Sequence, residues 1–219
     1  MMRWGMMQRH VGADPCEGLE LASVVPEEIA VLSVTECEAL LRTALEVMPR
    51  MMPFLVLGMF RGMRRRELER LRWEELDLEG GTVIAAARKV KTRQRRVVEV
   101  SEQMMSWITA AGWTRERMQT GPVAPGNLKT EWPKFWRLAG LKAWPHNGLR
   151  HTFASMHFAM WGDEARLQAI LGQRSAEVLH TNYRALVTRR EAEVFWGMMP
   201  EVVWSSDSDS DSDSYSDSI

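Results

Sequence analysis

The chain of 219 residues has only two cysteines, Cys16 and Cys37, which form neither a metal-ligand spacing nor a disulfide framework. A reducing compartment is therefore the default expectation. No apolar stretch approaches the ~20 uninterrupted residues that cross a bilayer. The longest, residues 51–60, contains a proline and predicts a buried helix. The N-terminus also lacks the apolar stretch and small-residue cleavage site of a signal peptide. These absences predict a cytoplasmic protein without a membrane span.

A net charge of −1 conceals an uneven distribution along the chain. Residues 207–219 carry five aspartates and no Lys or Arg, so the remainder has 28 basic against 24 acidic residues. Basic residues gather in two segments, 61–72 and 88–96, which a polyanionic partner would explain. Solvated faces of ordinary elements carry such charges too, and charge alone does not decide between these interpretations.

The pattern of apolar and turn residues divides the chain into three parts. Residues 1–32 lack periodicity and predict a loosely ordered arm, 33–200 a folded domain, and 201–219 a disordered acidic Ser/Asp tail. Capping boxes at Thr35–Glu38 and at Thr188–Glu191 predict helix starts, Thr130 predicts a third, and Gly172 predicts a helix end. Further helices are expected at 53–60, 65–76, 147–160, 163–171 and 175–186, and one restarting at 101.

Two β-prone runs, 82–86 and 96–100, stand on either side of the second basic segment and predict a small antiparallel sheet. The expected fold class is therefore mainly α with a small antiparallel β-sheet (α+β).

Four motifs stand out in this framework. A turn, Gly62-Met63-Arg64, enters a helix with Glu67 three residues later. Lys91 lies between the two strand segments, with Lys89 as an alternative. The third motif is the run 144–155, which contains Leu-Arg-His-Thr-Phe-Ala-Ser around Arg150. The fourth is Leu-Gly-Gln-Arg-Ser at 171–175, followed by Tyr183, the one tyrosine outside the acidic tail.

In order and in letters, these motifs resemble the tyrosine recombinase (phage integrase) family over residues 33–198. The resemblance implies two phosphate-binding arginines, Arg64 and Arg150, a hairpin lysine, Lys91, and a tyrosine nucleophile, Tyr183. The family usually has histidine three residues before the second arginine. Here Asn147 occupies that position and His146 precedes it, and both stay candidates. Gln173 replaces the usual His or Trp of the last motif.

The resemblance implies DNA strand cleavage and rejoining through a 3′-phosphotyrosyl intermediate. Planar guanidiniums would grip the nonbridging phosphate oxygens, and Lys91 would protonate the departing 5′-hydroxyl. No metal, nucleotide cofactor or small-molecule substrate is implied. The implied partner is double-stranded DNA, which several basic residues would contact, with a tetramer assembling on it in the nucleoid. These residues are Arg65, Arg66, Lys89, Arg93, Arg95, Arg96 and Arg174.

Two alternatives follow from the same motifs. One is a non-catalytic or decayed DNA-binding remnant of an integrase, with activity weakened at Asn147 and Gln173. The other is an enzyme like a type IB topoisomerase, which shares the nucleophile and the arginines. Family members normally carry a helical core-binding domain before the catalytic domain. Because only about 32 residues precede the first predicted helix, such a domain is expected to be absent.

Overall fold

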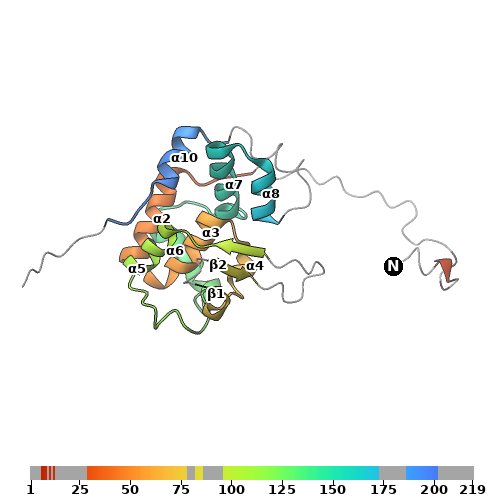
Figure 1. The fold of residues 1–219 in the computed structure, drawn as a ribbon, viewed down its shortest axis with the longest axis horizontal. Coiled ribbons are helices and arrows are strands. Elements are labelled where there is room, and N and C mark those ends of the chain that lie inside the picture. Colours follow the sequence, from red (N-terminus) through yellow and green to blue (C-terminus); the bar gives the residue numbers. More distant parts are fainter. Residues whose placement is uncertain are drawn as a thin grey trace, which may run out of the picture.

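The structure is a computed structural model, which describes residues 6–8, 10, 12, 29–77, 82–85, 96–172 and 186–201. The described part is mainly helical (Figure 1). Its α-helices are α2 (Val34–Glu46), α3 (Met52–Arg61), α4 (Arg65–Leu68), α5 (Glu102–Ala110), α6 (Leu128–Leu138), α7 (Gly148–Trp161), α8 (Glu164–Leu171) and α10 (Arg189–Trp196). Two 3-10 helices, η1 (Pro49–Met51) and η2 (Trp73–Glu75), and three strands, β1 (Leu76–Asp77), β2 (Thr82–Ala85) and β3 (Arg96–Glu99), complete the order. The expectation of a mainly helical fold is confirmed.

Helix α3 forms the centre of the molecule. Every residue from 52 to 60 is buried on it, because α2, α5, α7 and the short α4 pack around it (Figure 1). A helix that is apolar on all sides is stable in water only when neighbours cover every face. The prediction of a buried helix from the apolar run at 51–60 is therefore confirmed, and the packing shows that this helix is the central one.

The first long helix starts two residues earlier than predicted. Ser33, not Thr35, is the N-cap of α2: its hydroxyl accepts from the Glu36 amide at 3.2 Å, and the Glu36 carboxylate accepts from the Ser33 amide at 2.8 Å. The preceding residue, Leu32, is 1% exposed and donates its amide to Thr152 Oγ1 at 2.8 Å. This anchor on α7 fixes where the chain enters the helix.

The helix predicted at 65–76 is much shorter in the structure. α4 ends at Leu68, and the following segment is held by backbone hydrogen bonds from Trp73 N to Gly121 O (2.9 Å) and from Val123 N to Leu71 O (3.0 Å). Trp73 is 2% exposed. Extended pairing with a distant loop therefore replaces two turns of helix, and the prediction was wrong beyond residue 68.

The strands form one antiparallel sheet in the order β1-β2-β3. β2 pairs with β3 from Thr82 opposite Glu99 to Ala85 opposite Arg96, and β1 pairs with β2 at Leu76 and Asp77. Residues 86–95, which connect β2 to β3, lie outside the described part of the chain.

The sequence also predicted helix starts at Thr188 and Thr130 and a helix end at Gly172. Thr188 and Glu191 form the expected capping box at the start of α10, and Gly172 ends α8 in the left-handed region with φ 59°. Both predictions are confirmed. Thr130 is not a cap, because α6 begins at Leu128 and the Thr130 amide donates to Asn127 O within its first turn. The helix predicted at 175–186 lies outside the described residues.

Candidate functional site

The first motif is built on a left-handed glycine. α3 ends at Gly62, which has φ 59° and donates its amide to Gly58 O. A Cβ at residue 62 would lie 2.5 Å from Phe153 Cδ1, so α3 and α7 can approach this closely only at glycine. The turn then delivers Arg64 to the N-cap of α4 with extended backbone dihedrals.

Glu67 holds Arg64 at two points. One carboxylate oxygen accepts from the Arg64 amide at 3.0 Å, and the other accepts from the Arg64 guanidinium at 2.9 Å. The Arg64 side chain keeps 46% of its surface exposed. Glu67 therefore caps the helix and orients an exposed arginine.

Arg150 is the most constrained cation of the site. It lies in the first turn of α7, is only 6% exposed, and donates to two backbone carbonyls: Nη1 to Gly62 O and Nη2 to Leu171 O, both at 2.8 Å. These carbonyls stand at the ends of α3 and α8. The guanidinium therefore joins three helices at one point, where the planar fork of arginine matches two separate acceptors.

This junction brings three of the four sequence motifs together. Gly62 precedes Arg64 by two residues, Arg150 belongs to the third motif, and Leu171 opens the fourth. Segments that are about 90 and 20 residues apart in sequence thus meet at one side chain. This convergence indicates that the three motifs contribute to one common site.

Arg61, the last residue of α3, adds a second partly covered cation beside the junction. Burial lowers the pKa of the Arg61 guanidinium from its ordinary value, and Arg166 lowers the pKa further, whereas Glu99 opposes both effects. The buried Nε of Arg61 has no hydrogen-bond partner within the part of the chain that the structure describes. Arg61 and Arg166 therefore lie close enough to interact, and Glu99 is their nearby counter-charge.

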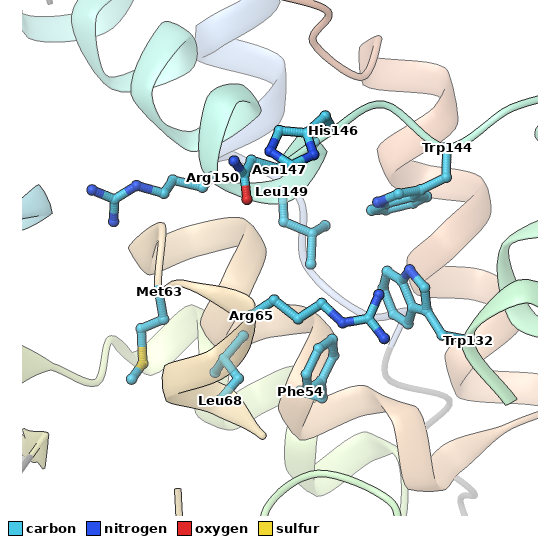
Figure 2. A pocket seen from close by; sticks show the side chains of 11 residues that line it. Phe54, Met63, Arg65, Leu68, Trp132, Trp144, His146, Asn147, Leu149 and Arg150 are labelled. Atoms are coloured by element: carbon cyan, nitrogen blue, oxygen red, sulfur yellow. The ribbon is translucent and has the colours of Figure 1, made fainter. Parts of the chain in front are cut away.

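His146 and Asn147 both reach the same pocket, which has a volume of about 430 Å³ and is also lined by Arg150 (Figure 2). Asn147 is the N-cap of α7 with φ 51° and ψ 26°, a left-handed conformation that asparagine tolerates better than most residues. Its carbonyl accepts from the amides of Arg150 and His151. Both side chains are exposed. Since both also line the pocket, His146 and Asn147 both remain candidates for the role of the family's usual histidine.

One exposed cation of α4 belongs to this pocket. Arg65 lines it and donates from Nε to Glu69 at 2.8 Å, and Arg66 is exposed on the same helix. Arg96 opens β3. The other candidate residues lie outside the described residues: Tyr183, Gln173, Lys91, Lys89, Arg93, Arg95 and Arg174. The meeting of Tyr183 and Lys91 with the two arginines therefore stays a prediction.

The apolar side of the pocket was not predicted from the sequence. Phe54, Trp132 and Trp144 line it together with Leu68 and Leu149. Two signals were available, namely tryptophans at 132 and 136, spaced one helical turn apart, and Trp144 at the start of the third motif. Neither signal distinguishes a core residue from one at a pocket.

Two general findings concern the described residues. They include no helix that is both apolar and long enough to cross a membrane. They also include no group of three or more His, Cys, Asp or Glu side chains arranged to hold a metal ion.

The geometry described above is that of a mainly helical domain with a buried arginine where three helices meet. The sequence matches the phage integrase family over residues 31–190, so the chain belongs to that family.

Among curated proteins, tyrosine recombinase XerC of Xylella fastidiosa (strain M23) is 24% identical over 181 residues, which cover 77% of this chain and 60% of the relative. The chain thus spans about three fifths of the length of this relative.

Solved structures share the fold at lower identity. The crystal structure of XerA recombinase superimposes with a TM-score of 0.57 at 22% identity, covering 81% of this chain and 68% of that one. The Tn1549 transposon integrase, in complex with circular intermediate DNA, superimposes with a TM-score of 0.56 at 17% identity, covering 87% of this chain and 73% of the other. These likenesses show that the chain has the fold of integrase catalytic domains.

Proposed function

We propose that this chain carries out site-specific DNA recombination and integration, by cutting and rejoining DNA strands through a 3′-phosphotyrosyl intermediate at Tyr183. The observation that carries this proposal is the Arg150 guanidinium, which joins the first, third and fourth family motifs at one place. Membership of the phage integrase family and the similarity to tyrosine recombinase XerC support the same reaction.

Arg64 and Arg150 are proposed to stabilise the pentacoordinate phosphorane. Arginine remains charged at every relevant pH, and its planar fork matches two nonbridging oxygens. The Gly62 turn and Glu67 position the first arginine, and the helix ends bonded to Arg150 position the second. Preorganised donors of this kind contribute most of the rate enhancement in many enzymes, because they need no rearrangement when charge develops.

In the proposed step, the phenolic oxygen of Tyr183 attacks phosphorus, and the bond from phosphorus to the 5′-oxygen breaks. The phenolic proton passes to His146 or to solvent water, and the departing 5′-oxygen takes a proton from Lys91, so that protons and charges balance. His146 or Asn147 assists at the pocket, and Gln173 donates a hydrogen bond to a phosphoryl oxygen. Attack by another 5′-hydroxyl reverses the chemistry and rejoins the strand without a metal or nucleotide cofactor.

The proposed partner is double-stranded DNA, held by phosphate contacts from the basic segments around Arg66 and Arg96. Such contacts give salt-dependent affinity that depends little on sequence. The solved Tn1549 integrase is a complex with DNA. We place the chain at the nucleoid in the cytoplasm, as a tetramer on DNA. Its parts are an arm at 1–32, the catalytic domain at 33–200 and an acidic tail at 201–219.

A suicide substrate tests the proposal. Nicked duplexes that tile the DNA flanking the chain's own coding sequence trap the phosphotyrosyl linkage, because the short released fragment diffuses away. We expect a covalent protein–DNA adduct with the unaltered chain and with Tyr215→Phe, and none with Tyr183→Phe. An adduct that survives in Tyr183→Phe contradicts the assignment. DNA binding without any adduct indicates a decayed remnant, and supercoil relaxation without a second site indicates a topoisomerase-like enzyme.

A further inference from the structure

The pocket beside Arg150 has an aromatic wall that the phosphoryl chemistry does not use. Phe54 and Trp132 meet edge to face with ring centroids 5.1 Å apart, and Trp132 and Trp144 do so at 4.7 Å. Phe54 and Trp132 are 2% and 4% exposed, whereas Trp144 is only partly buried. Trp144 is therefore the ring of the wall that an incoming group can contact most directly.

The pocket also has polar and cationic lining residues. Arg65, His146 and Asn147 line it, and none of the described lining residues is acidic. In Figure 2 the Arg65 side chain extends toward Phe54 and Trp132, whereas the Arg150 guanidinium extends the other way. A ligand with an anionic part and a flat apolar part would match this lining, with its anion near Arg65 and its ring against Trp144.

The size of the pocket restricts its occupant. An α-helix with its side chains is about 10–12 Å wide, so a pocket of about 430 Å³ admits a single ring system or side chain, not a helix or a base-paired duplex. Small-molecule sites of this kind occupy about 300–1,000 Å³ and combine apolar walls with a few polar groups. The chemistry and the dimensions both fit one nucleotide.

We propose that this pocket receives one unstacked nucleobase from the DNA strand whose phosphate Arg150 holds. The inference rests on the proposed function, because it takes DNA as the substrate. The base stacks on Trp144, and its own backbone phosphates lie toward Arg65. Trp132 supports this role, since its indole N–H is buried without a hydrogen-bond partner among the described residues, and ring nitrogens or carbonyls of a base are acceptors for it.

A base held outside the helix would open the duplex at the crossover. Every base presents a flat face to an aromatic side chain, so such stacking tolerates different sequences. The cost of unstacking is smallest at a mismatched, bulged or unpaired base. The chain should therefore prefer DNA in which one base is already unpaired.

The test compares two duplexes of the same sequence that carry 2-aminopurine, either fully paired or as a single-nucleotide bulge. We expect the bulged duplex to bind about 5- to 100-fold more tightly, the range that stacking on one aromatic ring supplies. We also expect the 2-aminopurine fluorescence of the bulge to fall on binding, because stacking quenches it.

Substitutions of Trp144 test whether this residue causes the preference for the bulged duplex. Trp144→Ala should lose most of the preference for the bulge and the quenching while binding the paired duplex as before, and Trp144→Phe should keep much of both. Trp113→Ala is the matched control: Trp113 is also partly buried and packs on another tryptophan, Trp73, at 5.2 Å, but it does not line the pocket. Thermal unfolding of each variant identifies any that has lost its fold.

The outcomes separate the two proposals. Equal affinity for both duplexes, or a bulge preference that Trp144→Ala retains, overturns the pocket assignment and leaves the proposed recombinase function standing. Failure to bind either duplex contradicts the DNA function and with it the pocket. Self-association of the chain that is lost in Trp144→Ala alone would show that the pocket holds a side chain of a second copy instead.

Discussion

Arg150 is at once a part of the proposed phosphate site and a structural link in the protein. Its side chain is almost fully buried, and its two charge-assisted hydrogen bonds end on carbonyls of two different helices. Hydrogen bonds to charged groups contribute about 1.5–3 kcal/mol each. The residue proposed to bind phosphate is therefore held in place by the same bonds that hold α3, α7 and α8 together.

Arg150→Lys should destabilise the fold as well as stop strand transfer. A single ammonium on a flexible chain cannot reproduce the fork between Gly62 O and Leu171 O, so we expect a loss of about 2–4 kcal/mol in the free energy of unfolding, measured by urea denaturation. The exposed Arg72→Lys is the control, with an expected change within about 0.5 kcal/mol. Equal stability of the two variants would show that the fork contributes nothing.

Gly62→Ala tests the close approach of α3 and α7. The alanine must adopt a left-handed conformation, which costs about 1–2 kcal/mol, and its Cβ must also displace Phe153, which adds about 1–3 kcal/mol. Gly140→Ala shares the positive φ, at 85°, but its Cβ would meet nothing within 4 Å. Chemical denaturation should therefore show a clearly larger loss at residue 62, and similar losses at both positions would contradict the packing argument.

At the scale of elements, α7 has two different ends. Its first turn carries Arg150 to the site, and its last turns pack against α10 through a cluster of rings. His157 lies 4.6 Å from Trp161 and 5.6 Å from Phe153 between ring centroids, and Trp196 of α10 donates from Nε1 to Met156 O. The segment that contains Tyr183 leads into α10. The packing of α10 against α7 therefore fixes the position of α10, which begins at Arg189.

This cluster should make stability depend on pH. Burial lowers the pKa of His157 from 6.5 to about 4, helped by Arg166 and Arg61 and opposed by Asp163. Because the unfolded chain takes up the proton first, the stability is complete above about pH 6.5. It decreases as the pH falls toward about 4, by about 3 kcal/mol in total.

Urea unfolding at a series of pH values measures this slope. His157→Asn cannot take up the proton, so its stability should change less over the same pH range, whatever its absolute value. A slope that is unchanged in His157→Asn would assign the pH dependence to other groups.

At the scale of the whole molecule, charge is divided between a basic body and an acidic end. Changing the five aspartates of residues 207–217 to asparagine would raise the net charge from −1 to +4. If the tail competes with DNA for the basic segments, this variant should bind a non-specific duplex about 2- to 10-fold more tightly at low salt. The difference should disappear at high salt, where charges are screened.

Fluorescence anisotropy at about 50 and about 300 mM salt measures the effect, since the Debye length shortens over this range. Replacing five tail serines by alanine alters the same segment without changing its charge and should leave the affinity unchanged. An effect of equal size in the serine variant would assign it to something other than charge.

Features that depend on a few neighbouring residues were determined by the sequence alone. The Thr188–Glu191 capping box and the left-handed stop at Gly172 involve groups within four residues of each other, so their geometry is local. The apolar run of α3 likewise predicted a buried helix, although the helices that cover it were not predicted. The order of the motifs, read as letters, was also sufficient to indicate the family.

Tertiary contacts decided the rest. Ser33–Glu36 and Thr35–Glu38 are both possible capping boxes, and the bond from Leu32 to Thr152, 120 residues away, accompanies the choice of the first. The helix after Arg65 ends early because residues 71–73 pair with 121–123. The fork of Arg150 and the aromatic pocket exist only once α3, α6, α7 and α8 have packed, since their partners are far apart in sequence and no local pattern encodes them.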